Sequence, residues 1–201
     1  MDDTPARGRP PRRLSGPDRR AAILARALPL FAARGYAGTT TRDLARASGV
    51  TEPVIYRHFP SKGALFLAVL SGAERRILAA LSDVLRGAEG ARARLHALTS
   101  GLEALLASVA LELRLLHGAA AAETEPRVTA AVRATYSRLA AALAAALRGP
   151  GLRRGVPASA AGTFLLEVGV GASLLRPLGV PALNRRGYGA AAERLLLAAL
   201  T

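Results

Sequence analysis

Residues 39–70 read TTTRDLARASGVTEPVIYRHFPSKGALFLAVL and contain two short helical patterns separated by a glycine. Thr40 is placed to cap the first helix through its hydroxyl, and Asp43, three residues later, completes a capping box. Gly49 follows the first helix, where a left-handed backbone conformation ends a helix abruptly. Thr51 then predicts the start of a second helix, again as an N-cap. The second helix is short and polar, so we expect it to lie on the surface.

The apolar and small residues of this stretch are spaced for two helices that cross closely over a short turn. Helices that cross at about 90–120° in this way form a helix-turn-helix, whose second helix enters the major groove of DNA. A small side chain at Ala45 is required because the second helix lies over it. The spacing alone also fits an ordinary corner between two helices of a helical protein. The pattern consists of Leu44, Ala45, Gly49, Val50 and Ile55.

The chain is strongly basic, and its charge is denser near this stretch than elsewhere. The 201 residues carry a net charge of +14, with 12 Lys and Arg against 5 Asp and Glu in residues 1–65, and 16 against 9 in the longer remainder. Such an excess is expected if the partner is phosphate. Because 27 of the 28 basic residues are arginine, nucleotide bias in the genome is a second explanation. The charge therefore supports a nucleic-acid partner without deciding it.

The residue types present argue against an enzyme, a metalloprotein and a membrane protein. The chain has no cysteine, its three histidines lack metal-ligand spacing, and no glycine-rich phosphate loop occurs. We therefore expect no enzymatic activity, no cofactor and no metal. No uninterrupted apolar run approaches the ~18 residues of a membrane span, and the N-terminus lacks the apolar segment of a signal peptide. We expect a cytoplasmic protein with no membrane partner.

Helical periodicity continues to the C-terminus and predicts an all-α fold of about nine helices. Residues 1–17, rich in proline and arginine, are expected to form a disordered basic arm. A three-helix domain in 18–65 and a larger helical domain in 66–201 follow. A helix over about 62–86 is predicted to connect them rigidly, because at 1.5 Å per residue it is about 37 Å long. Further helices are predicted over about 15–34, 91–109, 111–122, 126–147, 157–175 and 190–200.

The sequence from residue 23 to residue 70 resembles the N-terminal domain of TetR-family transcriptional regulators. The match runs without a gap over about the first third of the chain, and the remainder shares only the helical, variable character of that family. The resemblance implies a helix-turn-helix reader joined to an α-helical ligand-binding and dimerisation domain. The matching residues are Phe31, Gly35, Tyr36, Thr40, Thr41, Leu44, Ala45, Gly49, Val50, Ile55, Tyr56, His58, Phe59, Ser61, Lys62 and Leu65.

By this geometry and resemblance, the helix-turn-helix of residues 40–59 is expected to make two kinds of contact with double-stranded DNA. Arg42 is suited to guanine and Glu52 to cytosine, and the start of the second helix lies against base edges. Hydroxyl, imidazole and ammonium groups around it are suited to phosphates. For Tyr56 a half-buried core position is the alternative. The expected base contacts are Arg42, Glu52, Pro53 and Val54, and the expected phosphate contacts are Thr41, Thr51, Tyr56, His58 and Lys62, with Thr40 completing the motif.

The resemblance also implies a ligand pocket among the C-terminal helices and a dimer built from the last two long helices. Aromatic and polar residues in otherwise apolar helices are the candidates for ligand anchors, although each is more often an exposed or internally satisfied side chain. They are His96, Glu103, Glu112, His117, Arg133, Tyr136, Phe164 and Glu167. Small residues and leucines near the C-terminus suit a packed dimer, with the completion of the monomer core as the alternative. The expected dimer residues are Gly169, Ala172, Leu196 and Leu200.

For the whole chain the resemblance implies a homodimer on a near-palindromic operator, released by a small-molecule effector that the sequence does not identify. A repressor is the first expectation. An activator of the same family, or an architectural protein that coats DNA without reading its sequence, are the alternatives.

Overall fold

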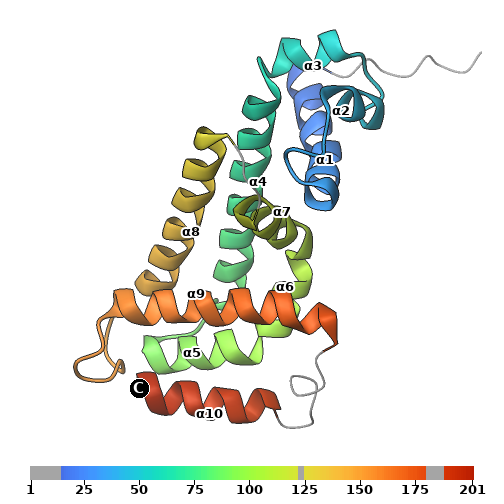
Figure 1. Cartoon of the computed structure of the whole chain (residues 1–201). Coiled ribbons are helices and arrows are strands. Elements are labelled where there is room, and N and C mark those ends of the chain that lie inside the picture. The colour runs from blue at the N-terminus through green and yellow to red at the C-terminus, as the bar shows by residue number, and fades with distance from the viewer. Residues whose placement is uncertain (1–14, 122–124, 180–187) are drawn as a thin grey trace, which may run out of the picture.

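The computed structural model describes residues 15–121, 125–179 and 188–201 (Figure 1). Over these residues the chain forms ten α-helices and one short 3-10 turn, with no strand, so the predicted all-α fold is confirmed. Three helices gather at one end, a long helix leads away from them, and the remaining helices pack along it and across its far end. The arm predicted for residues 1–17 lies outside the described residues except for its last three.

The N-terminal end consists of α1 (Gly16–Arg34), α2 (Thr41–Ala47) and α3 (Glu52–His58). α1 begins as predicted, because Ser15 is its N-cap and the Ser15 hydroxyl accepts a hydrogen bond from the amide of Asp18. The three helices share one apolar interior, so each positions the others. The buried side chains of this interior are Ile23, Ala27, Phe31, Leu44, Ala45, Ile55 and Phe59.

The long helix α4 (Lys62–Val84) leads from this end towards the opposite end of the molecule (Figure 1). Ser61 caps it, since its hydroxyl accepts from the amide of Ala64 at 3.0 Å. The helix ends two residues before the predicted end at Arg86. Its buried residues are Leu65, Phe66, Val69, Leu70, Ala73, Ile77 and Leu81.

The chain bends where one helix over 91–109 was predicted. The structure has α5 (Gly90–Ser100) and α6 (Leu102–Ser108), and the axis then turns by 76° into α7 (Ala110–Ala121). The single-helix prediction was therefore wrong. Gly101 lies at the first break, where a Cβ atom would come within 3.1 Å of Val84 at the end of α4. The apolar spacing is the same on both sides of the break, so it does not reveal the packing that causes it.

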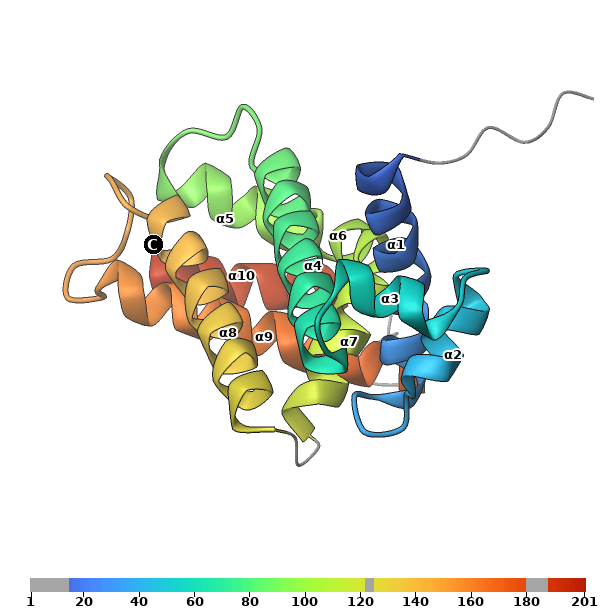
Figure 2. The ribbon, with the colours of Figure 1, turned by 90° about the horizontal axis from the view of Figure 1, so that it is seen from above.

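Three further helices complete the fold: α8 (Pro126–Ala146), α9 (Ala158–Leu175) and α10 (Tyr188–Leu200), with a 3-10 turn η1 (Arg176–Leu178) after α9. α8 lies beside α4, α9 crosses the foot of both, and α5 and α10 form the far end (Figures 1 and 2). A second apolar cluster closes this end. Its buried members are Leu81, Ala91, Leu95, Leu98, Leu147, Ala161, Leu165 and Leu200.

Apolar packing continues between the N-terminal helices and the rest of the chain. α7 contacts both α1 and α4, and buried Leu115 and Leu116 of α7 belong to the same cluster as Phe31 and Ile55. The boundary between residues 65 and 66 therefore stays a prediction. The N-terminal helices are held against α7 by their apolar interior, so we expect a shift of α7 to displace α1.

One segment of the described chain, Ala158–Leu178, is long and apolar enough to cross a membrane by length and composition, with a mean hydropathy of 1.5. It includes α9, which packs on α8. Glu167 and Arg176 interrupt its apolar character. A single such helix does not indicate a membrane protein.

Candidate functional site

The start of α2 is fixed by the capping box that the sequence predicted. The Thr40 hydroxyl accepts from the amide of Asp43 at 3.1 Å, and the amide of Thr40 donates to the Asp43 carboxylate at 3.2 Å. The Thr40 hydroxyl also donates to that carboxylate at 2.6 Å, and this bond holds the pKa of Asp43 below its ordinary value. The ionised carboxylate lies at the N-terminus of α2, where the helix dipole favours negative charge.

The turn between α2 and α3 has the predicted geometry, with one correction. Gly49 has a φ of 64°, and the amide of Val50 donates to the carbonyl of Ala45 at 3.0 Å. Thr51 occupies the N-cap of α3, but its side chain makes no capping bond. Pro53 provides no amide hydrogen, and the amide of the next residue already donates to the backbone carbonyl of Thr51 at 3.0 Å. The cap hydroxyl therefore has no free amide to accept from.

α3 is a short rod that lies against the protein along one side only. Ile55 is its single buried residue, at 1% exposed, while Pro53, Tyr56 and Arg57 are exposed. The rod lies at the end of the molecule remote from α5 and α10, and it faces the viewer in Figure 2. This is the placement that a helix needs in order to enter a groove of DNA.

Two residues expected to contact bases contact each other instead. The Arg42 guanidinium lies 3.5 Å from the Glu52 carboxylate, and the two side chains are 79% and 38% exposed. An ion pair this exposed contributes little to stability. The pair places the Arg42 guanidinium, a hydrogen-bond donor, beside the Glu52 carboxylate, an acceptor, at the solvent-accessible edge of α2 and α3.

The expected phosphate contacts divide between free and engaged groups. Tyr56 is 49% exposed and its hydroxyl donates to the Thr41 hydroxyl at 3.3 Å, so it does not occupy the half-buried core position that was its alternative. Thr51 is exposed and His58 is half-buried. Lys62 is engaged internally, because its ammonium donates to the carbonyl of Tyr36 at 3.0 Å and lies 4.2 Å from the centre of that ring.

Sequence reasoning missed a polar link between the N-terminal helices and α8. The Tyr36 hydroxyl donates to the carboxylate of Glu125, the residue before α8, at 2.6 Å. Burial and this carboxylate raise the pKa of Tyr36 to about 12, so the phenol stays protonated and the bond persists at neutral pH. The two residues are 89 positions apart, and no sequence pattern connects them.

A hollow of about 110 Å³ lies among α4, α5, α6, α7, α8 and α9, and we name it the apolar cavity. Of the predicted ligand anchors, only Tyr136 lines it. Gly169, predicted as a dimer residue, also lines it. The complete wall is Ile77, Leu81, Leu98, Thr99, Leu102, Leu105, Leu106, Val109, Leu113, Tyr136, Leu139, Leu143, Leu165, Leu166, Val168, Gly169 and Val170.

The charged residues predicted as anchors form ion pairs or lie on the surface, and none of them lines the apolar cavity, so their role in binding a ligand stays a prediction. His96 of α5 pairs with Glu193 of α10, and exposed Glu103 lies 3.7 Å from Arg176. Buried Glu112 accepts from Arg76 at 3.1 Å. The physical reason is common to all of them: a helix that buries one stripe turns its charged side chains to solvent or to a neighbouring helix.

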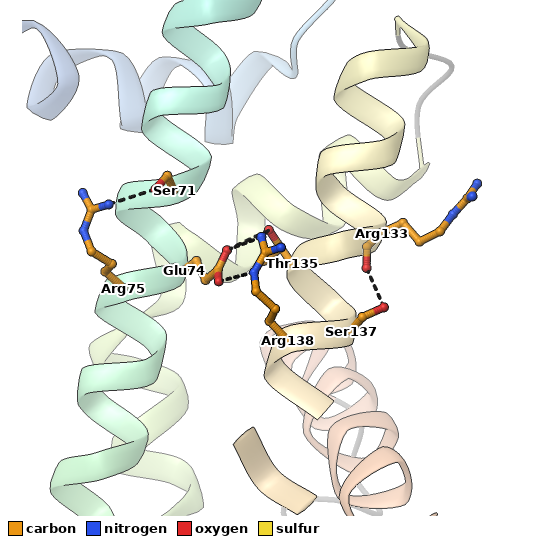
Figure 3. A network of polar contacts seen from close by, with 7 residues as sticks. All are labelled: Ser71, Glu74, Arg75, Arg133, Thr135, Ser137 and Arg138. Atoms are coloured by element: carbon orange, nitrogen blue, oxygen red, sulfur yellow. Dashed lines mark hydrogen bonds and ion pairs between the residues drawn. The ribbon is translucent and has the colours of Figure 1, made fainter. Parts of the chain in front are cut away.

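The other predicted anchors lie outside the cavity wall as well. Glu167 and Arg133 are exposed, and Figure 3 shows the Arg133 side chain extending away from its neighbours on α8. Phe164 is 42% exposed on α9. His117 does not line the cavity but bonds to Tyr136, which does, at 2.8 Å.

Two of the predicted dimer residues pack inside the protomer. Leu200 is 6% exposed in the second apolar cluster, and Leu196 packs against that cluster. For these two leucines the alternative, completion of the monomer core, is what the structure has. Ala172 is half-buried. The apolar residues that α9, η1 and α10 leave exposed are instead Phe164, Leu174, Leu175, Leu178 and Leu195.

A bidentate ion pair connects α4 to α8 beside the cavity. The Arg138 guanidinium donates to the two oxygens of Glu74 at 2.5 and 2.7 Å, and the Thr135 hydroxyl donates to the same carboxylate at 3.1 Å (Figure 3). The Arg138 bond holds the pKa of Glu74 below its ordinary value. In the described residues no group of three or more acidic or histidine side chains is arranged to hold a metal ion.

An exposed reading helix, a tight glycine turn and an all-helical body define a helix-turn-helix DNA-binding protein. Comparison with known proteins agrees: residues 23–69 match the family described as "Bacterial regulatory proteins, tetR family". The crystal structure of a TetR-family transcriptional regulator from Cytophaga hutchinsonii superposes over 94% of this chain and 98% of its own, with a TM-score of 0.72 at 19% identity, which shows the shared fold. Residues 23–69 therefore form a DNA-binding domain of the TetR type.

Curated relatives match over part of the chain. The chain is 39% identical over 83 residues to the nucleoid occlusion factor SlmA of Marinobacter nauticus, covering 41% of this chain and 43% of that protein. It is 36% identical over 91 residues to the transcriptional repressor KstR2 of Rhodococcus jostii, covering 45% of each. The chain thus spans less than half the length of these curated relatives.

Proposed function

We propose that this protein is a ligand-responsive transcriptional repressor that binds a near-palindromic operator as a homodimer. The observation that carries the proposal is α3, a short rod with one buried residue, with Arg42 and Tyr56 exposed and Glu52 half-buried around it. Exposed basic side chains of the same end provide attraction to phosphate. The proposal places the protein in the cytoplasm, where its DNA lies.

The homodimer is supported by the surface of α9 and α10. α9 is the most apolar of the long helices, yet Phe164, Leu174 and Leu175 are 42–48% exposed. Leu178 and Leu195 are 74% and 73% exposed. Exposed apolar patches of this kind mark interaction sites in proteins that otherwise bury their leucines. A second copy would cover this surface and bring a second α3 to the DNA.

The ligand response is supported by the position of the apolar cavity. Its wall includes Leu113 of α7, and α7 packs on α1 of the DNA-binding end. It also includes Val168 and Gly169 of α9, the helix with the exposed apolar surface. A ligand that prefers one arrangement of these helices would change the separation of the two reading helices. Repression follows if the free protein is the form that fits the operator.

Selection of bound genomic fragments tests the proposal. Fragments recovered with the purified protein should share a near-palindromic site, and random duplex should compete at least a thousandfold less well at physiological salt, as for other specific readers. If random duplex displaces the protein as well as its own fragment does, it coats DNA without reading it. A reporter placed behind the recovered site then distinguishes repression from activation.

A further inference from the structure

The wall of the apolar cavity offers a ligand almost no polar group. In the described part of the chain it has no charged side chain, and all but three of its residues are leucine, isoleucine or valine. The exceptions are Gly169, Thr99 and Tyr136. The volume, about 110 Å³, is similar to that of engineered apolar cavities of about 150 Å³ that bind benzene. The chemistry of Thr99 and Tyr136 therefore decides which polar group a ligand can bring.

Hydrogen bonds on α7 and α9 fix the direction of the Tyr136 hydroxyl. The Ser173 hydroxyl donates its one proton to the carbonyl of Val170 at 2.8 Å. The same hydroxyl lies 2.7 Å from Nε2 of His117, and because its proton is used it can only accept a hydrogen bond there. Nε2 of His117 is thus the protonated nitrogen, and in neutral imidazole Nδ1 is the acceptor. Nδ1 lies 2.8 Å from the Tyr136 hydroxyl, which must donate to it. Towards a ligand in the cavity, the Tyr136 hydroxyl can therefore only accept a hydrogen bond.

Thr99 is restricted in the same way. Its hydroxyl lies 3.0 Å from the carbonyl oxygens of both Leu95 and His96, and its one proton is directed to them. What Thr99 can offer the cavity is again a lone pair. Within the helices, backbone groups bond to one another. The side chains of the cavity wall therefore present acceptors without a free donor.

A ligand's carboxylate or phosphate would find neither a cation nor a donor in this cavity, and a buried ion without partners is strongly disfavoured. A carbonyl group would lose its bonds to water without replacement. We propose that the apolar cavity binds a small uncharged aliphatic molecule whose polar group, where it has one, is a hydrogen-bond donor such as an alcohol. This names the class of effector, and it rests on the ligand-responsive function proposed above.

A second hollow of the described surface has two arginines, Arg86 and Arg94, in its wall and differs in character. Arg94 donates to the carbonyl oxygens of Ala88 and Ala146, and Arg86 pairs with Asp83. An acidic ligand would therefore bind in this second hollow and not in the apolar cavity. A measurement that reports where a ligand binds is therefore required.

Methyl-labelled NMR titration of the full chain provides that measurement. The probes are 1-hexanol, 2-hexanone and hexanoate at pH 7, which share a six-carbon chain and differ in the polar group. We expect 1-hexanol to shift the methyl signals of the cavity wall. It should bind the cavity at least tenfold more tightly than hexanoate does, and more tightly than 2-hexanone does. From 1-butanol to 1-hexanol the affinity should rise roughly fourfold per methylene.

Variants connect the shifts to the cavity. Leu106→Phe on α6 and Leu143→Phe on α8 each fill the cavity and should weaken the binding of 1-hexanol at least tenfold. Two sites are used in case one variant fails to fold. Tyr136→Phe keeps the ring and removes the acceptor, so the preference for 1-hexanol over 2-hexanone should decrease.

Two outcomes would overturn the assignment of the ligand class. Hexanoate could shift the cavity methyls within tenfold of 1-hexanol, or 1-hexanol could leave them unshifted while it binds elsewhere. Binding to a recovered genomic fragment is measured on the same samples. If 1-hexanol fills the cavity and the affinity for DNA is unchanged, the ligand class stands and the ligand-responsive function is what fails.

Discussion

Gly162 is a residue at which α9 approaches α8 closely. A Cβ atom there would lie 2.5 Å from the amide nitrogen of Ala144 and 2.7 Å from the carbonyl oxygen of Ala140. Both are helix backbone atoms, so relief requires the two helices to separate. We expect Gly162→Ala to lower the free energy of unfolding by about 1–3 kcal/mol, measured by urea denaturation.

Gly118 on α7 is the matched control, because it is an exposed helical glycine with nothing within 4 Å of an added Cβ. Gly118→Ala should leave stability unchanged or raise it by up to about 1 kcal/mol, since alanine favours the helix. Equal effects of the two substitutions would show that the α8–α9 contact is looser than the structure has it.

Arg42 is the residue whose substitution tests sequence readout. Arg42→Ala should cost about 1–3 kcal/mol of binding free energy at the cognate site and relax preference at one base pair. It should change stability little, because the pair with Glu52 is exposed. Binding to the recovered site and to single-base variants of it is measured by fluorescence anisotropy.

Arg57 is the control for Arg42, because it carries the same charge on α3 and is exposed without an ion pair in the described residues. Arg57→Ala should weaken binding to all DNA sequences by a similar amount, which is smaller than the loss that Arg42→Ala causes at the cognate site. A uniform loss with Arg42→Ala, matching that of Arg57→Ala, would mean that Arg42 contacts phosphate and reads no base.

At the scale of helices, α4 and α8 are joined by the ion pair of Glu74 and Arg138. The Arg138 hydrogen bonds lower the pKa of Glu74, so the folded protein binds this proton less readily than the unfolded chain. The resulting stability is present above the ordinary value of 4.5 and is lost as the pH falls through the lowered pKa. We expect Glu74→Gln to destabilise the protein at pH 7 and to have a smaller effect near pH 3.

Urea unfolding across that pH range measures this effect. Glu103→Gln is the control, because Glu103 is 86% exposed and lies 3.7 Å from its partner Arg176. It should leave the pH dependence unchanged. If Glu74→Gln and the wild type lose stability in parallel between pH 7 and pH 3, the pair does not set the acid sensitivity.

Helix boundaries were predictable where caps decide them, and packing partners were not. Thr40 with Asp43, Gly49 and Ser61 gave the bounds of α2 and the start of α4, because caps act within four residues. Gly101, at the break, packs against Val84, which is 17 positions away, and the apolar periodicity does not reveal such a contact.

The reading site was largely predictable, since its residues are adjacent in sequence. The cavity was predicted poorly, because its wall is made of leucines that look like any helix core, and the polar residues chosen as anchors satisfy one another elsewhere. The small residues of α9 indicated close approach correctly at Gly162, yet the partner is α8 of the same chain. Gly169 and Gly171 have nothing within 4 Å of an added Cβ.

For the whole molecule, the proposed dimer depends on the apolar surface of α9 and α10, which would bring two reading helices to one DNA duplex. A dimer that binds successive major grooves on one face needs its α3 helices about 34–36 Å apart. A single copy makes few contacts, and joining two copies multiplies affinity through the high effective concentration of the second reader. The dimer surface therefore controls DNA affinity without touching DNA.

Phe164→Arg on α9 and Leu195→Arg on α10 each place a charge on that surface, at side chains 42% and 73% exposed in the protomer. Folding of the protomer should survive, because neither side chain is buried in it. We expect sedimentation velocity to show monomers at micromolar concentration, and affinity for the full operator to fall by at least a hundredfold, towards that of a half-site. Ala79→Arg adds the same charge at an exposed position of α4 and should leave both measurements unchanged. A variant that sediments as a monomer yet holds the full operator with wild-type affinity would separate DNA recognition from dimerisation, and the two-headed reader would then be the wrong account of this surface.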